Sequence, residues 1–282
     1  MYANSKNKRK DNVFVNAKIV SLEELTNIPT ISSKSQVIIS EDVIVNVVSD
    51  KYGFLPNERY YTAVEEKLIN AEISYSTQSI NKENKSFKVD YILGDDYATT
   101  IGTKDDKIVP LMSFTNSYDG SSKTTGTFGL YRQVCSNGLM VADTKVGFSI
   151  KHIGNQVDII MPEIDRLIQE FTKTEYYELQ KKFEILAGRK INNVQKFVEQ
   201  ICQESKIFKF ESNPESQEVV LTKKAEAVID IINRESSLLK VEPNMWLGYN
   251  AFNEIIHSMN MRNFETKNEK DHKMFETILE FA

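Results

Sequence analysis

Polar side chains able to hold a ligand are concentrated between residues 113 and 139, in the stretch SFTNSYDGSSKTTGTFGLYRQVCSNGL. The pattern predicts a strand, an Asp119-Gly120 turn, a Ser/Thr/Gly loop, a second strand and an Asn137-Gly138 turn. Glycine suits both turns because it adopts a positive φ without steric cost. The polar side chains that this stretch would present are Asn116, Asp119, Ser121, Ser122, Lys123, Arg132 and Asn137.

Nucleophilic catalysis would pair Cys135 with one of the three histidines, His152, His257 or His272. Cys135 lies near a predicted strand end, not at a helix N-terminus that would lower its pKa. A zinc site needs Cys and His at short spacings, and these residues are scattered. The chain also lacks the glycine-rich motifs that bind nucleotides. We therefore expect no catalytic residue, no metal and no cofactor, and a binding protein more than an enzyme.

Two acidic pairs, Asp95/Asp96 and Asp105/Asp106, are candidates for metal ligands. Adjacent side chains of a strand point to opposite faces, so neighbouring carboxylates rarely hold one ion together. Both pairs are therefore interpreted as turns between strands.

The strongest functional signal between residues 107 and 151 is electrostatic. This segment contains five basic residues and two acidic residues, Asp119 and Asp143, whereas the whole chain has a formal net charge of -5. Lysines and arginines that contact phosphates, with aromatic rings that stack on bases, are typical of single-strand grooves. The alternative is that the rings point into the core and the lysines into water. The groove residues would be Lys107, Lys123, Phe128, Tyr131, Arg132, Lys145 and Lys151.

Arg132 is the most informative of these positions. A guanidinium in an otherwise apolar strand must reach either an acidic partner, for which Asp119 is one candidate, or a ligand.

The bulk composition predicts a globular protein. The 282 residues are 40% hydrophobic and 27% charged, and no apolar run approaches the roughly 20 residues of a membrane helix. Residues 1–12 are polar and basic, which is unlike a secretory signal and predicts a disordered arm. Cys135 and Cys202 lie far apart, as expected of free thiols in a reducing cytoplasm. We therefore expect a cytoplasmic protein with no membrane partner.

The elements that would position these residues change character near residue 155. Residues 13–155 predict a β-rich domain, an antiparallel meander with one helix over 57–71 that is capped by Asn57. Residues 156–282 predict a helical domain packed on it, with helices over 157–188, 191–208, 221–239 and 245–260. Pro162 is expected near a helix start, Cys202 in the core, and 265–273 in a polar linker. The fold class is therefore α+β.

Two anchors identify a family resemblance. NSYDGS at 116–121 with FGLYRQVCSNGL at 128–139, followed by WLGYNAFNEIIH at 246–257, resembles the phage- and plasmid-borne domain of unknown function 932. The resemblance covers roughly residues 35–260, and it departs where Phe252-Asn253 replaces the more usual Val-Thr. The family motif falls on Asn116, Asp119, Gly120, Ser121, Arg132, Cys135, Asn137, Gly138, Tyr249, Asn250, Glu254 and His257.

The motif residues on the late helix have structural interpretations as well. Tyr249, Asn250 and His257 would pin the helical half onto the sheet through buried hydrogen bonds. Asn250, Glu254 and His257 share one helix face, which is either a docking network or a site.

The resemblance implies a protein of mobile elements, encoded near replication and recombination functions, without an established activity. A β-meander followed by helices is also analogous to single-strand annealing recombinases, although an analogy of fold does not establish function. Three hypotheses follow. The first is an oligomeric single-stranded DNA-binding protein of recombination or replication, and the second is a virion or host-interaction protein without nucleic-acid affinity. The third is an enzyme that brings Asp119, Arg132, Glu254 and His257 into one pocket.

Overall fold

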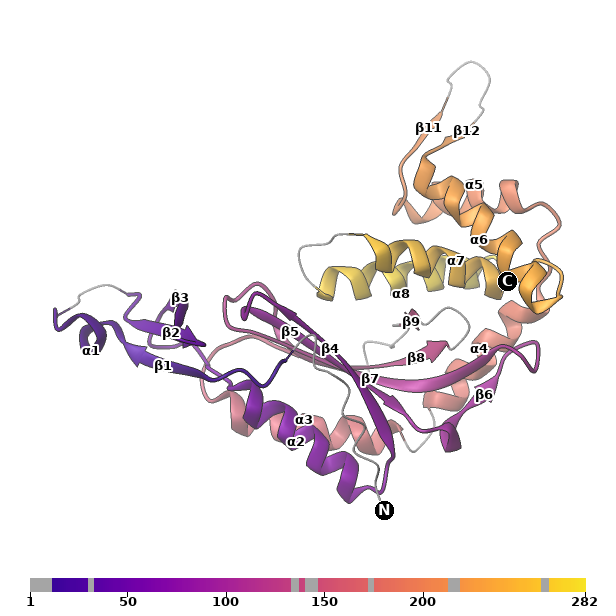
Figure 1. Cartoon of the computed structure of the whole chain (residues 1–282). Coiled ribbons are helices and arrows are strands. Elements are labelled where there is room, and N and C mark those ends of the chain that lie inside the picture. Colours follow the sequence, from indigo (N-terminus) through magenta and orange to yellow (C-terminus); the bar gives the residue numbers. More distant parts are fainter. Residues whose placement is uncertain are drawn as a thin grey trace. The chain divides into compact units, whose positions relative to one another are not determined.

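The computed structural model in Figure 1 describes residues 12–29, 33–132, 137–139, 147–171, 175–212, 219–259 and 264–282. Strands dominate the first half of the chain and helices the second, so the predicted α+β class is confirmed. The strands are β1 (Ala17–Ser21), β2 (Gln36–Ser40), β3 (Val43–Val48), β4 (Tyr75–Lys82), β5 (Ser86–Leu93), β6 (Thr99–Thr100), β7 (Lys107–Ser117), β8 (Thr124–Arg132), β9 (Asn137–Leu139), β10 (Phe148–Ile150), β11 (Phe210–Ser212) and β12 (Val219–Leu221).

The α-helices are α1 (Leu22–Thr26), α2 (Asn57–Asn70), α3 (Gln156–Phe171), α4 (Glu175–Gly188), α5 (Val194–Ser205), α6 (Lys223–Leu239), α7 (Met245–Ser258) and α8 (Phe264–Glu280). A 3-10 turn, η1, covers Asp95–Tyr97. The described strands form three sheets, in the orders β1-β2-β3, β10-β8-β7-β5-β4 and β11-β12. In the largest sheet β6 also pairs with β7, and β9 pairs with β8.

The chain divides into two compact units that do not follow its order. Unit 1 comprises Met1–Tyr91, Ser113–Gly126 and Phe148–Ile168. Unit 2 comprises Ile92–Met112, Thr127–Gly147 and Gln169–Ala282. The two units therefore differ from the predicted domains, which meet at one boundary near residue 155. The predicted division into 13–155 and 156–282 stays a prediction.

Aromatic residues build the core of unit 1. The ring of Phe114 packs against Tyr60, Tyr91 and Phe148, at centroid separations of 6.0, 5.7 and 6.3 Å. Helix α2 supplies Tyr60 and its buried neighbours, as the helical periodicity predicts. In Figure 1 α2 lies beside α3, and the Lys67 ammonium of α2 is 2.8 Å from the Asp165 carboxylate of α3. One sheet face and one helix face are therefore buried together, as layered domains require.

The core of unit 2 is formed by helices α4 to α8 with parts of β7 and β8. Trp246, Phe183, Tyr249 and Phe275 stack around one another, with the Phe183 and Trp246 centroids 4.6 Å apart. Cys202 is fully buried here, which confirms its predicted core position. Burial raises the pKa of its thiol to about 12, so the thiol stays protonated and unreactive at neutral pH.

Several predictions made from local sequence patterns are wrong. Pro162 lies inside α3 rather than at its start, and the proposed linker 265–273 belongs to α8. Asn57 does not cap α2; its side-chain amide instead bonds the Val13 carbonyl and the Asn116 amide. The Asn137-Gly138 pair lies in β9, opposite Arg132 and Tyr131, and not in a turn. At Asn57, at the Asn137-Gly138 pair and in α8, a tertiary or cross-strand partner outweighs the local preference.

Candidate functional site

Arg132 is fully buried in unit 2, where it joins two carboxylates. Its Nε and Nη2 donate to Asp106 at 2.6 and 2.7 Å, and its Nη1 donates to Glu235 at 2.6 Å. The Asp106 carboxylate also accepts the indole N–H of Trp246 at 2.7 Å, and the guanidinium lies 5.5 Å from that ring. Of the two predicted partners for Arg132, an acid or a ligand, the structure shows acids. They are Asp106 and Glu235, and not the predicted candidate Asp119.

This buried network contains two carboxylates and one guanidinium among the described residues. Burial raises the pKa of the Glu235 carboxyl, although the neighbouring Arg132 opposes the shift. A charge taken out of water without full compensation is energetically unfavourable, which is why burial dominates here. The network is therefore a tightly held structural unit, and Arg132 is not accessible to a nucleic-acid ligand. Its predicted place in a binding groove is wrong.

Other predicted groove residues are also occupied by the fold. Phe128 is 2% exposed, and Tyr131 is half-buried against a small apolar cluster that contains Val109 and Leu111. The Lys107 ammonium is 2.9 Å from the Asp95 carboxylate. The aromatic part of the groove prediction is therefore incorrect at Phe128. Cys135 and Lys145 lie outside the residues that the structure describes.

The first family anchor forms the end of strand β7 and the turn after it. The Asn116 amide donates to the Leu55 carbonyl and to Asn57, at 2.9 and 2.8 Å. The Asp119 carboxylate accepts the backbone N–H of Ser121 at 2.9 Å, and Gly120 adopts a φ of 72°. The predicted Asp119-Gly120 turn is confirmed, and these residues stabilise the backbone that carries Lys123.

The second anchor holds two helices of unit 2 together. The buried Asp271 carboxylate of α8 accepts Tyr249 Oη at 3.0 Å and Asn253 Nδ2 at 2.8 Å, and lies 3.4 Å from His257 Nε2. Tyr249, Asn253 and His257 follow one another at intervals of four residues, so they share one face of α7. The docking interpretation is therefore supported, with α8 and not the sheet as the partner of Tyr249 and His257.

The remaining residues of that anchor make separate contacts. Asn250 donates to the Trp246 carbonyl one turn earlier in α7, at 2.7 Å. Glu254 accepts from the exposed Arg234 of α6 at 3.0 Å. The predicted face of Asn250, Glu254 and His257 therefore does not act as one network. Asn253 and Asp271 were missed, the latter because its segment resembles a polar linker.

Three lysines of unit 1 are brought to one end of its sheet by backbone pairing. Strand β10 pairs with β8 so that Ile150 lies opposite Thr124 at the end of the ladder, and Lys151 and Lys123 are the next residues beyond that pair. The Lys51 carbonyl accepts the N–H of Gly154 at 3.1 Å, just after Lys151. Lys51 and Lys151 are exposed, and Lys123 is half-buried. We call Lys51, Lys123 and Lys151 the lysine end.

The sheet face that leads to the lysine end is polar. Side chains alternate along a strand, so Lys88 and Asp90 lie opposite the aromatic face that carries Tyr91. Lys88 and Asp90 pair at 2.8 Å, and the hydroxyl groups of Thr115 and Thr125 lie 2.6 Å apart. The aromatic rings of unit 1 thus pack on one face, and lysines and hydroxyl groups occupy the other.

His152 fastens the turn that carries Lys123. Its Nδ1 lies 3.3 Å from the Gly53 carbonyl and its Nε2 lies 3.2 Å from the Ser122 carbonyl, while the Tyr52 ring stacks on it. Burial lowers the pKa of His152, opposed by these carbonyls and by Asp119. A neutral imidazole has one N–H and can therefore donate to only one of the two carbonyls.

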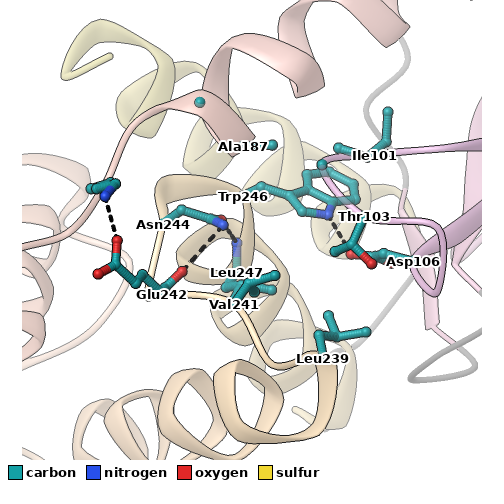
Figure 2. Close-up of a pocket in the computed structure, with 13 residues that line it drawn as sticks. Ile101, Thr103, Asp106, Ala187, Leu239, Val241, Glu242, Asn244, Trp246 and Leu247 are labelled. Atoms are coloured by element: carbon teal, nitrogen blue, oxygen red, sulfur yellow. Dashed lines mark hydrogen bonds and ion pairs between the residues drawn. The ribbon is translucent and has the colours of Figure 1, made fainter.

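Unit 2 contains a pocket of about 310 Å³ beside the buried arginine network (Figure 2). The indole of Trp246 lines it, and its N–H points to Asp106. The Asn244 side chain, at the start of α7, accepts the Leu247 N–H at 3.0 Å. Lys190 and Glu242 form an ion pair at the same pocket. The pocket therefore combines apolar walls with charged groups.

The chain belongs to the family described as "Domain of unknown function (DUF932)", whose model matches residues 44–278. The predicted resemblance is thereby confirmed, and it extends further toward the C-terminus than the motifs alone indicate. The comparison with curated proteins found no match, and the comparison with solved structures found none either. Among the described helices, none is both long and apolar enough to pass through a bilayer.

Proposed function

We propose that this protein binds single-stranded nucleic acid through the lysine end of unit 1. The observation that carries the proposal is the pairing of β8 with β10, which ends at Ile150 and Thr124, the direct neighbours of Lys151 and Lys123, together with the backbone bond between Lys51 and Gly154. Backbone pairing thus brings three lysines from three segments to the end of a sheet face that carries polar side chains. The family anchor around Asp119 and Gly120 shapes the turn between them.

Binding of this kind depends on phosphates more than on bases. Lysines contact phosphate oxygens as point charges and release counterions, so affinity falls steeply with salt and depends little on sequence. Base stacking contributes less than a groove with aromatic platforms would provide, because Phe128 and Phe148 pack into the interior. We therefore expect modest affinity at physiological salt and a clear gain at low salt.

The test is fluorescence anisotropy of a labelled oligo-dT, titrated with the protein at several salt concentrations. The triple variant Lys51→Gln, Lys123→Gln, Lys151→Gln removes the proposed phosphate contacts. Each lost contact should reduce the slope of log affinity against log salt by about 0.7, so the triple variant loses about 2. A matched control, Lys196→Gln, Lys209→Gln, Lys273→Gln, removes three exposed lysines of unit 2.

Equal weakening in both triple variants would mean attraction by overall charge and would refute the lysine end. Absence of binding by the unaltered protein at low salt would refute nucleic-acid binding altogether. Arg132 is left unchanged in both triple variants, because its removal would leave two buried carboxylates without a cation.

The setting that we propose is recombination or replication of a phage or plasmid, with the protein acting as an oligomer. The support is the family and the sequence-tolerant binding that the lysine end favours. An annealing assay with complementary strands, combined with sedimentation to measure the oligomeric state, tests this setting separately from binding.

A protein-interaction function has one observation in its favour. Val43 and Ile44, adjacent on β3, are 60% and 54% exposed, which is unusual for two neighbouring β-branched residues. The oligo-dT titration distinguishes the two functions, because an interaction protein without nucleic-acid affinity would show no salt-dependent binding.

A further inference from the structure

We infer that the pocket of unit 2 binds a small organic cation, an ammonium or guanidinium group carried on a short apolar body. The pocket lies in a different unit from the lysine end, and its ligand would have the opposite charge to a nucleic acid. The inference therefore goes beyond the proposed function and does not depend on it.

The pocket walls favour an apolar body. Six apolar side chains line it, from the β6–β7 turn, from α4, from the end of α6, from the segment between α6 and α7, and from the first turn of α7: Ile101, Ala187, Leu239, Val241, Trp246 and Leu247. Its volume of about 310 Å³ lies at the lower end of the range for small-molecule sites, about 300–1,000 Å³. A ligand of a few carbon atoms with one polar group fits such a space.

The charges around the pocket favour a cation. Asp106 lines the pocket, and behind it the guanidinium of Arg132 is shared with Glu235, so two carboxylates face one cation. Glu242 is balanced by Lys190. The last residues of α4 and α6, Gly188 and Leu239, also line the pocket, and helix C-termini carry partial negative charge.

Two contributions oppose the negative charge around the pocket but do not reverse its sign. The start of α7 at Asn244 adds one partial positive charge, against two helix C-termini. Burial also raises the pKa of the Glu235 carboxyl and favours its neutral form, which reduces the negative charge of the network. The Asp106 carboxylate and the two helix C-termini are the negative groups that a cation in the pocket would compensate.

An organic cation suits the pocket better than a metal ion. Both oxygens of Asp106 already accept from Arg132 or Trp246, so they attract a cation across the pocket without being free to coordinate it. Hard metal ions need several oxygen ligands in direct contact. Ammonium and guanidinium groups are satisfied by diffuse attraction and by carbonyl acceptors, while their carbon chains cover apolar walls.

Trp246 makes the test direct, because it is the only tryptophan of the chain and it lines the pocket. Its fluorescence should respond saturably to n-butylammonium at constant ionic strength. The matched probes are n-butanol, which has the same body without charge, and butyrate, which has the opposite charge. We expect at least about a tenfold lower affinity for n-butanol and butyrate than for the ammonium, as the loss of one charge interaction of about 1.4 kcal/mol would give.

Two variants locate the binding. A Cβ at Gly188 would meet no heavy atom within 4 Å, so Gly188→Leu adds a side chain at the pocket wall without a clash at Cβ. It should weaken n-butylammonium binding at least about tenfold. Arg189→Leu changes the next, exposed residue, which does not line the pocket, and should leave binding unchanged. Asp106→Asn removes one charge and should weaken binding similarly, provided that thermal melting confirms its fold.

Equal affinity for n-butanol would identify a purely apolar pocket and overturn the inference. Preference for butyrate, no saturable response to any probe, or full binding by Gly188→Leu would overturn it as well. The oligo-dT result has no bearing on these outcomes.

Discussion

Arg132 holds a positive charge in the interior of unit 2, and its removal should be among the most damaging single changes. Arg132→Met would leave Asp106 and Glu235 buried without their cation, which typically costs about 3–5 kcal/mol of unfolding free energy. Urea unfolding monitored by circular dichroism measures the loss. The double variant Arg132→Met, Glu235→Gln should recover part of it, because one unpaired carboxylate is then removed.

Arg234 provides the matched control for this prediction. It is also an arginine paired with a glutamate, Glu254, but it is 59% exposed. Surface pairs contribute about 0–1 kcal/mol, so Arg234→Met should change stability by less than that. Similar losses for Arg132→Met and Arg234→Met would contradict the buried network.

Among the secondary-structure elements, helices α7 and α8 are held together through the Asp271 carboxylate. Asp271→Ala would leave the Tyr249 hydroxyl and the Asn253 amide without their carboxylate, at about 1–3 kcal/mol for each buried group. We expect faster hydrogen exchange across α8, measured by mass spectrometry, and a lower unfolding midpoint. Glu269→Ala, an exposed position of the same helix, is the control. Unchanged exchange in α8 of the Asp271 variant would show that apolar packing alone holds the helices.

The stability of the whole molecule should depend on pH through His152. Burial holds the pKa of His152 below its ordinary value of 6.5, against its two carbonyl contacts and the charge of Asp119. The folded state then binds fewer protons than the unfolded state, so the stability that His152 contributes is lost as pH falls through 6.5. Glu235 acts oppositely, because its raised pKa makes the folded state bind more protons above 4.5.

A comparison with His152→Gln separates the two contributions, since Glu235 is common to both proteins. The unaltered protein should have a higher unfolding free energy than His152→Gln, measured by urea unfolding. This difference should be smaller at pH 5.5 than at pH 7.5 by on the order of 1 kcal/mol. A difference in stability that stays constant between the two pH values would mean that the pKa of His152 is not lowered.

The sequence by itself determined the fold class, most of the elements and the family. Periodicity predicts α2 and α5 to α7, because an amphipathic helix must bury one stripe wherever it docks. The Asp119-Gly120 turn follows from local chemistry, and the structure retains it. Lys123 and Lys151 were predicted as binding residues from charge alone, and their role in binding stays a prediction.

Only the tertiary structure decided which partners these elements bring together. The requirement that Arg132 find an acid was predictable, but the choice of Asp106 and Glu235 over Asp119 was not. These acids lie 26 and 103 residues from Arg132 in the chain, and no local pattern links them. Likewise, Phe128 faces the interior while Lys123 faces outward because alternation gives two faces and only packing selects the buried one. A contact between distant residues depends on the free energy of the whole core, which the sequence around any one residue does not contain.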